Sequence, residues 1–249
     1  MGALDGRVSI VTGGAQGLGR AYCLGLAAEG SAVVVADLRD GQPVVDEVEA
    51  TGGNALAVRT DVSDVASTED MARTAFERFG RIDVLVNNAA YFKTVQRRPF
   101  YELDLDEWDR AFHVNVRGMW LCCRAVYPHM REQRYGKIIN ISSNTAWKGV
   151  PNFLHYVASK SAVLGLTRAL AREVGDDNIA VNTVAPDFVP DEEMARTRSA
   201  EAELIVRQRC FQRTQVPEDM VGIVVWLAGA GSDFVTGQSF LVNGGAHFQ

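Results

Sequence analysis

The stretch that decides the fold runs from Val8 to Gly19 and reads Val-Ser-Ile-Val-Thr-Gly-Gly-Ala-Gln-Gly-Leu-Gly. Its apolar, β-branched first part, Val8–Thr12, predicts a buried strand. The glycines behind it predict a tight turn into a helix, because glycine adopts positive φ and lets the backbone approach a pyrophosphate. The N–H groups at the helix start would then bind phosphate oxygens. A dinucleotide in this turn is expected to contact Gly13, Gln16, Gly17, Leu18 and Gly19.

The spacing of these glycines leaves a second interpretation open. They follow the pattern Thr-Gly-x-x-x-Gly-x-Gly instead of the G-x-G-x-x-G dinucleotide fingerprint, and a glycine cluster also suits a purely structural turn. Asp37 favours the dinucleotide, because an acid at the end of the second predicted strand accepts hydrogen bonds from ribose hydroxyls and repels the 2′-phosphate of NADP. Neither Gln16 nor Leu38 is basic, so we expect NAD, with Arg39 as the possible exception. A capping role for Asp37 is the alternative.

Apolar runs of the same kind return along the whole chain. The predicted strands are Val8–Thr12, Ala32–Asp37, Ala55–Thr60, Ile82–Asn87, Lys137–Ser142, Ile179–Ala185 and Ser239–Val242. The predicted helices between them are Gly17–Glu29, Pro43–Thr51, Asp64–Phe79, Asp104–Arg131, His155–Val174 and Pro217–Ala230. Continuous apolar strands that alternate with helices predict an α/β fold, with a doubly wound parallel sheet of about seven strands and helices on both faces. We expect a single domain over residues 1–249.

One long connection interrupts this alternation. Residues 186–215 carry mixed charges and weak helical patterning without a strand, and they follow the sixth predicted strand. Long connections inside a compact domain are usually functional, and this one begins at the sheet edge where such folds bind ligands. We therefore predict that residues 186–215 cover the substrate.

Composition excludes several classes of protein. The chain has 249 residues, 47% of them hydrophobic and 22% charged, which is typical of a globular domain. A formal net charge of −6 argues against binding to nucleic acid, and Arg97 and Arg98 are interpreted as part of a solvated loop. We predict no membrane span, because apolar runs stay below the ~18–20 residues that cross a bilayer. Four cysteines without a C-x-x-C pair, and no secretory signal, predict a cytoplasmic protein.

Tyr156 and Lys160 are the residues most suggestive of catalysis. They lie four apart in a predicted helix and so share one face, where an ammonium lowers the pKa of a neighbouring phenol. Such a tyrosine can take a proton from an alcohol or give one to a ketone. Ser143, thirteen residues earlier, could hydrogen-bond the substrate oxygen, and Asn115 could hold a water toward Lys160. The alternatives are a surface pair on a helix for Tyr156 and Lys160, and a cap for Ser143.

These motifs together resemble the short-chain dehydrogenase/reductase family. The resemblance rests on the glycine turn, Asn87-Asn88-Ala89-Ala90, Asn115, Ser143 and Tyr156-Ala-Ser-Lys160, in this order over essentially the whole chain. It implies a Rossmann-type fold and a catalytic set of Asn115, Ser143, Tyr156 and Lys160, with Tyr156 and Lys160 also contacting the cofactor. It further implies cofactor contacts from Leu38, Asp61, Val62, Asn88, Pro186 and Val189, and we expect no metal ion.

The chain departs from the family after the sixth strand. The family usually reads Pro-Gly-x-x-x-Thr there, whereas this chain has Asp187 and Asp191 in place of the glycine and the threonine. An acid near a pyrophosphate is unfavourable unless it points away. Asn87-Asn88-Ala89-Ala90 also ends on alanine where the family has glycine.

The loop between Ser143 and Tyr156 suggests the kind of substrate. Its large side chains predict a ring-bearing alcohol, with Tyr91 and Phe92 on the opposite wall. The segment resembles the pyridoxal 4-dehydrogenase and 1-phenylethanol dehydrogenase branches of the family. Two carboxylates, Asp187 and Asp191, favour a substrate with hydroxyl or cationic groups. The predicted substrate pocket comprises Asn144, Trp147, Phe153, Asp187 and Met194.

The expected activity is therefore NAD-dependent hydride transfer between a cyclic or aromatic alcohol and its carbonyl. Two alternatives stay open: a 3-oxoacyl-acyl-carrier-protein-type ketoreductase, and a non-catalytic dinucleotide-binding regulatory protein. Apolar positions on more than one face of the helices 104–131 and 155–174, including Trp120, Leu121 and Leu166, predict a homotetramer.

Overall fold

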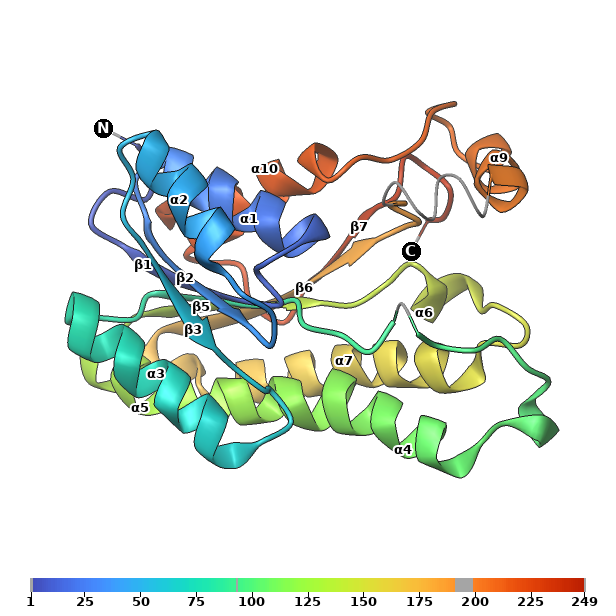
Figure 1. The fold of residues 1–249 in the computed structure, drawn as a ribbon, viewed down its shortest axis with the longest axis horizontal. Coiled ribbons are helices and arrows are strands. Elements are labelled where there is room, and N and C mark those ends of the chain that lie inside the picture. The colour runs from blue at the N-terminus through green and yellow to red at the C-terminus, as the bar shows by residue number, and fades with distance from the viewer. Residues whose placement is uncertain (1, 93, 191–198, 249) are drawn as a thin grey trace.

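Seven parallel strands form one sheet in the order β3-β2-β1-β4-β5-β6-β7 (Figure 1). The computed structural model describes residues 2–92, 94–190 and 199–248. The strands are β1 (Val8–Thr12), β2 (Ala32–Asp37), β3 (Ala55–Arg59), β4 (Val84–Asn87), β5 (Gly136–Ile141), β6 (Ile179–Pro186) and β7 (Ser239–Val242). All seven predicted strands are confirmed, with ends that differ by no more than two residues. The single α/β domain with a doubly wound sheet is confirmed as well.

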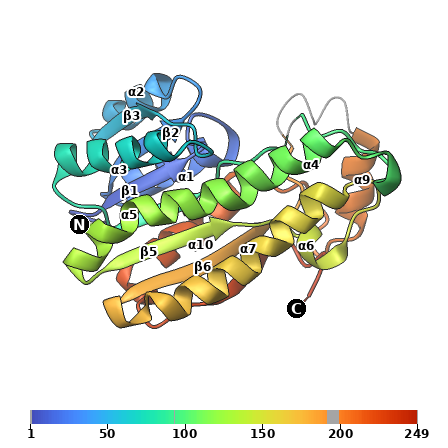
Figure 2. The ribbon, with the colours of Figure 1, turned by 90° about the horizontal axis from the view of Figure 1, so that it is seen from below.

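The strands are apolar on both faces because both faces are covered. In β2, Val33 and Val35 enter one core cluster while Val34 and Ala36 enter the other. The first cluster packs under α1 (Gly17–Ala28), α2 (Gln42–Ala50) and α10 (Glu218–Ala228). The second packs under α3 (Val65–Phe79), α5 (Met119–Gln133) and α7 (Leu154–Glu173), which lie side by side in Figure 2.

Helix ends follow the chemistry of the sequence. The Asp64 side chain accepts a hydrogen bond of 2.7 Å from the N–H of Ser67 and so caps the start of α3. The same helix ends on Gly80 at φ 75°, where glycine avoids a steric cost. Short 3-10 turns occupy Phe100–Glu102, Gly175–Asp177 and Ala230–Ser232.

The predicted single helix Asp104–Arg131 is wrong in its middle. The structure has α4 (Leu105–Phe112), a π-helical turn at His113–Gly118, and then α5. The turn holds Asn115, whose side-chain amide bonds backbone groups of Tyr91 and the hydroxyl of Ser159. Sideways bonds of this kind from a buried amide accompany a locally widened helix, and π-turns often mark functional sites.

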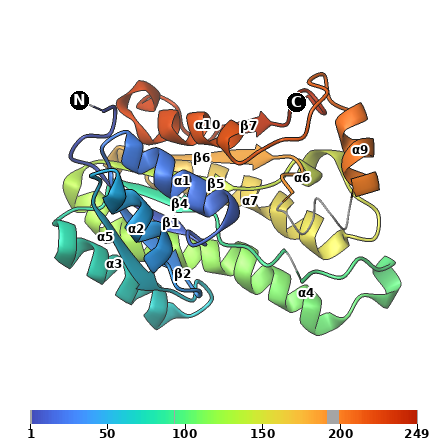
Figure 3. The same ribbon diagram turned by 45° about the horizontal axis from the view of Figure 1, so that its top comes forward.

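The carboxyl ends of the strands meet additional short elements at one end of the sheet. Helix α4, α6 (Thr145–Lys148) and α9 (Ser199–Arg207) all lie beyond this end in Figure 3. The strand order reverses between β1 and β4, and α/β sheets bind ligands in the crevice at such a point. Within the described ranges, no helix is both long and apolar enough to span a bilayer.

Candidate active site

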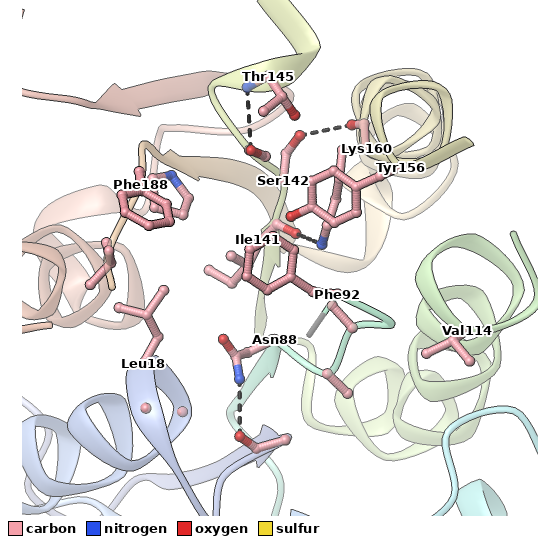
Figure 4. Close-up of a pocket in the computed structure, with 18 of the residues that line it drawn as sticks. Leu18, Asn88, Phe92, Val114, Ile141, Ser142, Thr145, Tyr156, Lys160 and Phe188 are labelled. Carbon is pink, nitrogen blue, oxygen red and sulfur yellow. Dashed lines mark hydrogen bonds between the residues drawn. The ribbon is translucent and has the colours of Figure 1, made fainter. Parts of the chain in front are cut away.

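A cavity of about 1060 Å³ lies at the carboxyl edge of the sheet. The glycine turn lines one end, and Ser143, Tyr156 and Lys160 line the other. Figure 4 views this cavity: Leu18 and Phe188 lie across it from Tyr156 and Lys160. Pockets for one small ligand usually measure about 300–1,000 Å³, so this cavity has room for a cofactor and a substrate together.

The glycine turn forms a cradle that side chains would fill. Gly13 has φ +64°, and a Cβ there would lie 2.9 Å from Cα of Ala89. A Cβ on Gly19 would lie 1.9 Å from the carbonyl oxygen of Gly13. The turn leads directly into α1, whose first N–H groups have no partner inside the helix. This open backbone at a helix N-terminus fits the pyrophosphate of a dinucleotide.

Asn88 fixes the glycine turn against the neighbouring strand. Its side-chain amide donates hydrogen bonds to the carbonyl oxygens of Thr12, at 3.0 Å, and Gly13, at 3.1 Å. The Thr12 hydroxyl in turn accepts from the backbone N–H groups of Asn88 and Ala89. The two strand ends at the switch point are thereby locked together, and Asn88 lines the cavity beside the turn.

Asp37 supports the glycine turn and also lines the cavity. One carboxylate oxygen accepts from the Ala15 N–H at 3.0 Å, and the other accepts from the Arg39 N–H at 2.9 Å. Each oxygen keeps a second lone pair, and the carboxylate lines the cavity, so it can still accept from ribose hydroxyls. Further sequence-predicted cofactor residues that line the cavity are Gln16, Gly17, Leu18, Leu38, Asp61, Val62, Pro186 and Val189.

The predicted catalytic residues from β5 and α7 converge. Tyr156 is 7% exposed and lines the cavity together with Ser143. Lys160 is fully buried, donates to the carbonyl oxygen of Ile141 at 2.8 Å, and has its ammonium 5.9 Å from the Tyr156 ring centroid. Figure 4 shows the Lys160 side chain running beside Tyr156 toward Ile141. The one-turn spacing on α7 produces this juxtaposition.

Burial controls the acidity of both groups in this structure. It raises the pKa of the Tyr156 phenol above its ordinary value of 10.0, and the nearby Ser143 hydroxyl offsets part of that increase. Burial lowers the pKa of Lys160 to about 8. Desolvation is the largest influence on the phenol here, so the lowered pKa expected from the sequence is not found in this structure.

Asn115 does not line the cavity. Its side-chain oxygen accepts from the Tyr91 N–H at 2.7 Å, and its amide donates to the Ser159 hydroxyl at 3.0 Å. Ser159 donates in turn to the carbonyl oxygen of Tyr156. Asn115 thus ties the loop after β4 to the turn of α7 that carries the tyrosine. Among the described residues, no hydrogen bond joins the Asn115 side chain to Lys160.

Asp187 lines the cavity, but its charge is already neutralised. One carboxylate oxygen accepts from Arg209 at 3.0 Å, and the other accepts from Lys148 and Asn144, both at 3.2 Å. The side chains of Asp187 and Arg209 are 3% and 2% exposed. These ion pairs remove the reason to expect a cationic substrate group at Asp187, while the expectation of hydroxyl groups stays a prediction. Asp191, the second carboxylate of that argument, lies outside the described residues.

The predicted substrate residues divide into three groups. Phe153 lines the cavity and stacks on Tyr156 with ring centroids 4.6 Å apart, and Phe92 faces it from the loop after β4. Trp147 and Asn144 are not among the described lining residues of this cavity. Asn144 is fully buried and bonds Asn243 and Asp187 instead. Met194 lies outside the described residues.

Two basic residues of the cavity were missed by sequence reasoning. Arg97 was interpreted as solvated, yet it lines the cavity with its guanidinium carbon 5.0 Å from the Phe153 ring centroid. Lys148 lines it from α6. The sequence did contain features that could have indicated them. Arg97 belongs to a basic doublet with Arg98, and Lys148 lies five residues after Ser143. Tyr91, predicted for the opposite wall, lies under Arg110 and is not a described lining residue.

Comparison with known proteins agrees with this site. A family model described as "Enoyl-(Acyl carrier protein) reductase" matches residues 13–247. The chain is 36% identical, over 97% of both chains, to the hydroxy(phenyl)methylsuccinyl-CoA dehydrogenase subunit BbsD of Thauera aromatica. It is 35% identical, over 98% of both, to a 3-oxoacyl-acyl-carrier-protein reductase of Synechocystis. The chain belongs to the short-chain dehydrogenase/reductase family of nicotinamide-dependent oxidoreductases.

Solved structures agree on the fold. A candidate short-chain alcohol dehydrogenase of Sinorhizobium meliloti superposes with a TM-score of 0.92 at 31% identity, over 98% of this chain and 97% of that one. A candidate NAD(P)-dependent gluconate 5-dehydrogenase of Beutenbergia cavernae, with bound NADP at low occupancy, superposes with a TM-score of 0.89 at 36% identity, over 97% and 96% of the two chains.

Proposed function

We propose that this chain transfers hydride between NAD and a ring-bearing alcohol or its carbonyl. The observation that carries the proposal is the convergence of Ser143, Tyr156 and Lys160 at one end of a cavity whose other end is the glycine cradle. Steady-state turnover of a panel of cyclic, aromatic and linear alcohols and ketones, with both NAD and NADP, tests it. Reaction confined to linear β-keto thioesters would overturn the ring assignment.

Ser143, Tyr156 and Lys160 each have a separate role in the proposed proton transfer. In alcohol oxidation the Ser143 hydroxyl hydrogen-bonds the substrate oxygen, and the Tyr156 phenolate accepts the hydroxyl proton. Lys160, held by the Ile141 carbonyl, keeps a positive charge beside the ring, which stabilises phenolate. The oxidised dinucleotide, when bound, supplies the hydride acceptor and additional positive charge. In the reverse direction Tyr156 donates its proton to the carbonyl oxygen.

Asp37 supports NAD over NADP. Its carboxylate stands at the adenosine end of the cavity, where a 2′-phosphate would meet a negative charge. Arg39 also lines this end, and the Beutenbergia cavernae structure contains NADP. In this proposal the charge of Asp37, and not that of Arg39, decides the preference for NAD. Two backbone hydrogen bonds hold the Asp37 carboxylate buried against the turn.

Two aromatic side chains support a ring-bearing substrate. Phe153 and Phe92 both line the cavity, with ring centroids 4.6 Å and 5.2 Å from that of Tyr156. Flat apolar walls next to the proton-transferring phenol favour a substrate whose ring adjoins the carbinol carbon. The name of the Thauera aromatica relative includes a phenyl-bearing hydroxy compound, which supports the same class.

A 3-oxoacyl-acyl-carrier-protein ketoreductase is the second candidate. Reductases of that description from Synechocystis and Staphylococcus aureus are 35% and 34% identical to this chain. An acetoacetyl thioester in the substrate panel discriminates between the two candidates. A non-catalytic dinucleotide-binding protein would bind the cofactor and turn over none of the panel.

We also propose a homotetramer in the cytoplasm, with residues 186–215 over the substrate. Trp120 of α5 is 49% exposed, and an exposed indole on a long helix supports a subunit contact. Leu121, by contrast, is buried in the monomer core. Four free cysteines support a reducing compartment. From the long connection, the described residues Asp187, Phe188, Ile205 and Gln208 line the cavity.

A further inference from the structure

The Asp187 carboxylate joins segments that lie far apart in the sequence. Asp187 directly follows β6, and its two oxygens bind partners on two other segments. Oδ1 accepts from Asn144 and from Lys148, both at 3.2 Å, whereas Oδ2 accepts from Nη2 of Arg209 at 3.0 Å. The proposed proton transfer uses none of these groups, although Asn144 is the residue next to Ser143. The cluster therefore calls for a role of its own.

A single oxygen of this carboxylate holds both ends of the short helix α6. Asn144 occupies the N-cap position of α6, and Lys148 is the last residue of the helix. Both side chains donate to Oδ1 of Asp187. A helix of one turn gains little stability from its own hydrogen bonds, because the first turn fixes several backbone dihedral angles for one bond. The position of α6 therefore depends on tertiary contacts such as these two.

The start of α6 sets the orientation of the Ser143 hydroxyl. The Thr145 N–H donates to Oγ of Ser143 at 3.2 Å, a bond that Figure 4 draws as a dashed line. Because the oxygen accepts this bond, the hydroxyl keeps its own hydrogen for donation to a substrate oxygen. A shift of α6 would displace the Thr145 N–H and let the Ser143 side chain rotate.

The backbone on either side of Ser143 is held independently of the carboxylate. The Ser142 N–H donates to the carbonyl oxygen of Val184 at 2.9 Å, and the Asn144 N–H donates to that of Pro186 at 2.8 Å. These bonds extend the pairing of β5 with β6 to both neighbours of Ser143. Loss of the carboxylate should therefore leave Ser143 in the cavity wall and change the direction of its hydroxyl.

We propose that Asp187 is a positioning residue for hydride transfer: through Oδ1 it fixes both ends of α6 and so aims the Ser143 hydroxyl at the substrate oxygen. This inference rests on the proposed function, in which Ser143 hydrogen-bonds that oxygen, and it holds for any alcohol or carbonyl in the cavity. Arg209 keeps the buried carboxylate charged and in place from the other side. Because a displacement of about 1 Å in an active site can cost ~10²-fold in rate, a small movement of α6 is enough.

A double-mutant cycle with Ser143 separates positioning from general structural support. Asp187→Ala should lower kcat by at least ~10-fold while Ser143 is present, and by no more than about two-fold in Ser143→Ala, which has no hydroxyl to aim. The substrate is any alcohol or ketone of the panel that the native chain turns over. In parallel, amide hydrogen exchange at residues 143–149 should be faster in Asp187→Ala than in the native chain.

Lys148→Met is the second variant, and it decides the matter if Asp187→Ala does not fold. It keeps the buried pair of Asp187 with Arg209 and removes one of the two α6 donors to Oδ1. We expect kcat to fall by about three-fold or more, again only while Ser143 is present. Lys148 also lines the cavity, but an effect through direct contact with the substrate would persist in Ser143→Ala.

Asp83→Ala is the matched control, because Asp83 is a fully buried carboxylate that also binds two cations, Arg7 and Arg81. Asp83 precedes β4 and lies at the opposite end of the parallel sheet from Ser143. Asp83→Ala should lower stability and leave both kcat and amide exchange at residues 143–149 unchanged.

Three results would overturn the role of Asp187. They are an equal loss of kcat with and without the Ser143 hydroxyl, unchanged amide exchange at residues 143–149, and an effect of Asp83→Ala as large as that of Asp187→Ala. Turnover by the native chain together with any of these results keeps the proposed function and rejects the positioning role. A native chain that turns over nothing in the panel rejects both.

Discussion

Asp187 and Arg209 form an ion pair with 3.0 Å between Oδ2 and Nη2, and both side chains are almost fully buried. Arg209 also donates to the carbonyl oxygens of Phe188 and Arg213, so one guanidinium joins both ends of the described long connection. Arg209→Met should reduce the free energy of unfolding by ~2–3 kcal/mol, because it leaves Oδ2 of the buried carboxylate and two backbone carbonyl oxygens without their donor, while Lys148 still pairs with Oδ1. Denaturant unfolding measures the loss.

The exposed pair Arg213 and Asp219 provides the control for this prediction. Arg213 is 57% exposed, so Arg213→Met should cost less than ~1 kcal/mol. The double variant Asp187→Leu/Arg209→Met should recover part of the single-variant loss, since it removes both charges together. A loss for Arg209→Met no larger than that for Arg213→Met would contradict the importance given to the buried pair.

Tyr156→Phe should lower kcat by ~10²–10⁴-fold, because the reacting oxygen loses its proton acceptor. Quenching of protein fluorescence by NADH should continue at similar concentrations, since the glycine cradle is untouched. Tyr22→Phe is the control: the Tyr22 hydroxyl is buried without a hydrogen-bond partner in the described structure, so its removal should leave turnover unchanged. Near-normal turnover by Tyr156→Phe would remove the tyrosine from the mechanism.

Asp37→Asn should raise the ratio of kcat/KM for NADP to kcat/KM for NAD by at least ~10-fold, because it removes the charge that opposes the 2′-phosphate. Asparagine can still accept from the Ala15 N–H, so the glycine turn keeps this support. Asp40→Asn, three residues on and absent from the described cavity wall, should leave the ratio unchanged. If the native enzyme prefers NADP, the decisive residue is Arg39.

His155 should make the protein less stable in weak acid. The side chain is fully buried, and burial lowers its pKa below the ordinary 6.5 despite Glu107 at 3.7 Å. Below about pH 6.5 the unfolded chain therefore binds a proton that the folded chain resists, so stability falls as pH decreases, by no more than ~1.4 kcal/mol per pH unit. His155→Gln should remove this part of the slope between pH 5 and 7 in thermal or denaturant unfolding. His129→Gln, in α5, should leave this part of the pH dependence of stability unchanged.

Trp120→Glu should dissociate the proposed tetramer. Light scattering of the native protein is expected to give about 109 kDa, four times the 27.2 kDa chain. A buried charge at a helix contact disfavours association, so the variant should show a smaller mass. Phe100→Glu, at an exposed position away from the long helices, should keep the native mass. A monomer mass for the native protein at micromolar concentration would refute the assembly.

The strands were predictable because parallel strands covered on both faces must be apolar throughout. β2 illustrates this: its residues enter both core clusters in alternation, and its predicted and observed bounds agree at Ala32–Asp37. The glycine turn and the pair Tyr156 and Lys160 were predictable for a related reason. Their geometry depends on neighbours within one turn of chain, which a sequence displays directly.

The substrate end was harder to predict because it depends on contacts between distant segments. Asp187 looked like an open carboxylate, since nothing local reveals that Arg209, twenty-two residues later, neutralises it. Adjacent residues of the short helix α6 point in different directions, so Lys148 lines the cavity and Trp147 does not. Spacing along the chain gave no means to choose between them, because the orientation of a single helical turn is set by what it packs against.

The π-helical turn at His113–Gly118 has a consequence for how this chain can vary in length. A π-turn winds one more residue into its turn than an α-helix does, so converting these residues into regular α-helix at the same chain length would rotate everything downstream by ~100° about the helix axis. Cys122, Val126 and Met130 would swing away from the sheet that they now cover. The loss of one residue from the turn would cancel that rotation, so this turn is the place along the helix where the chain can lose a residue and keep the buried face of α5 on the sheet.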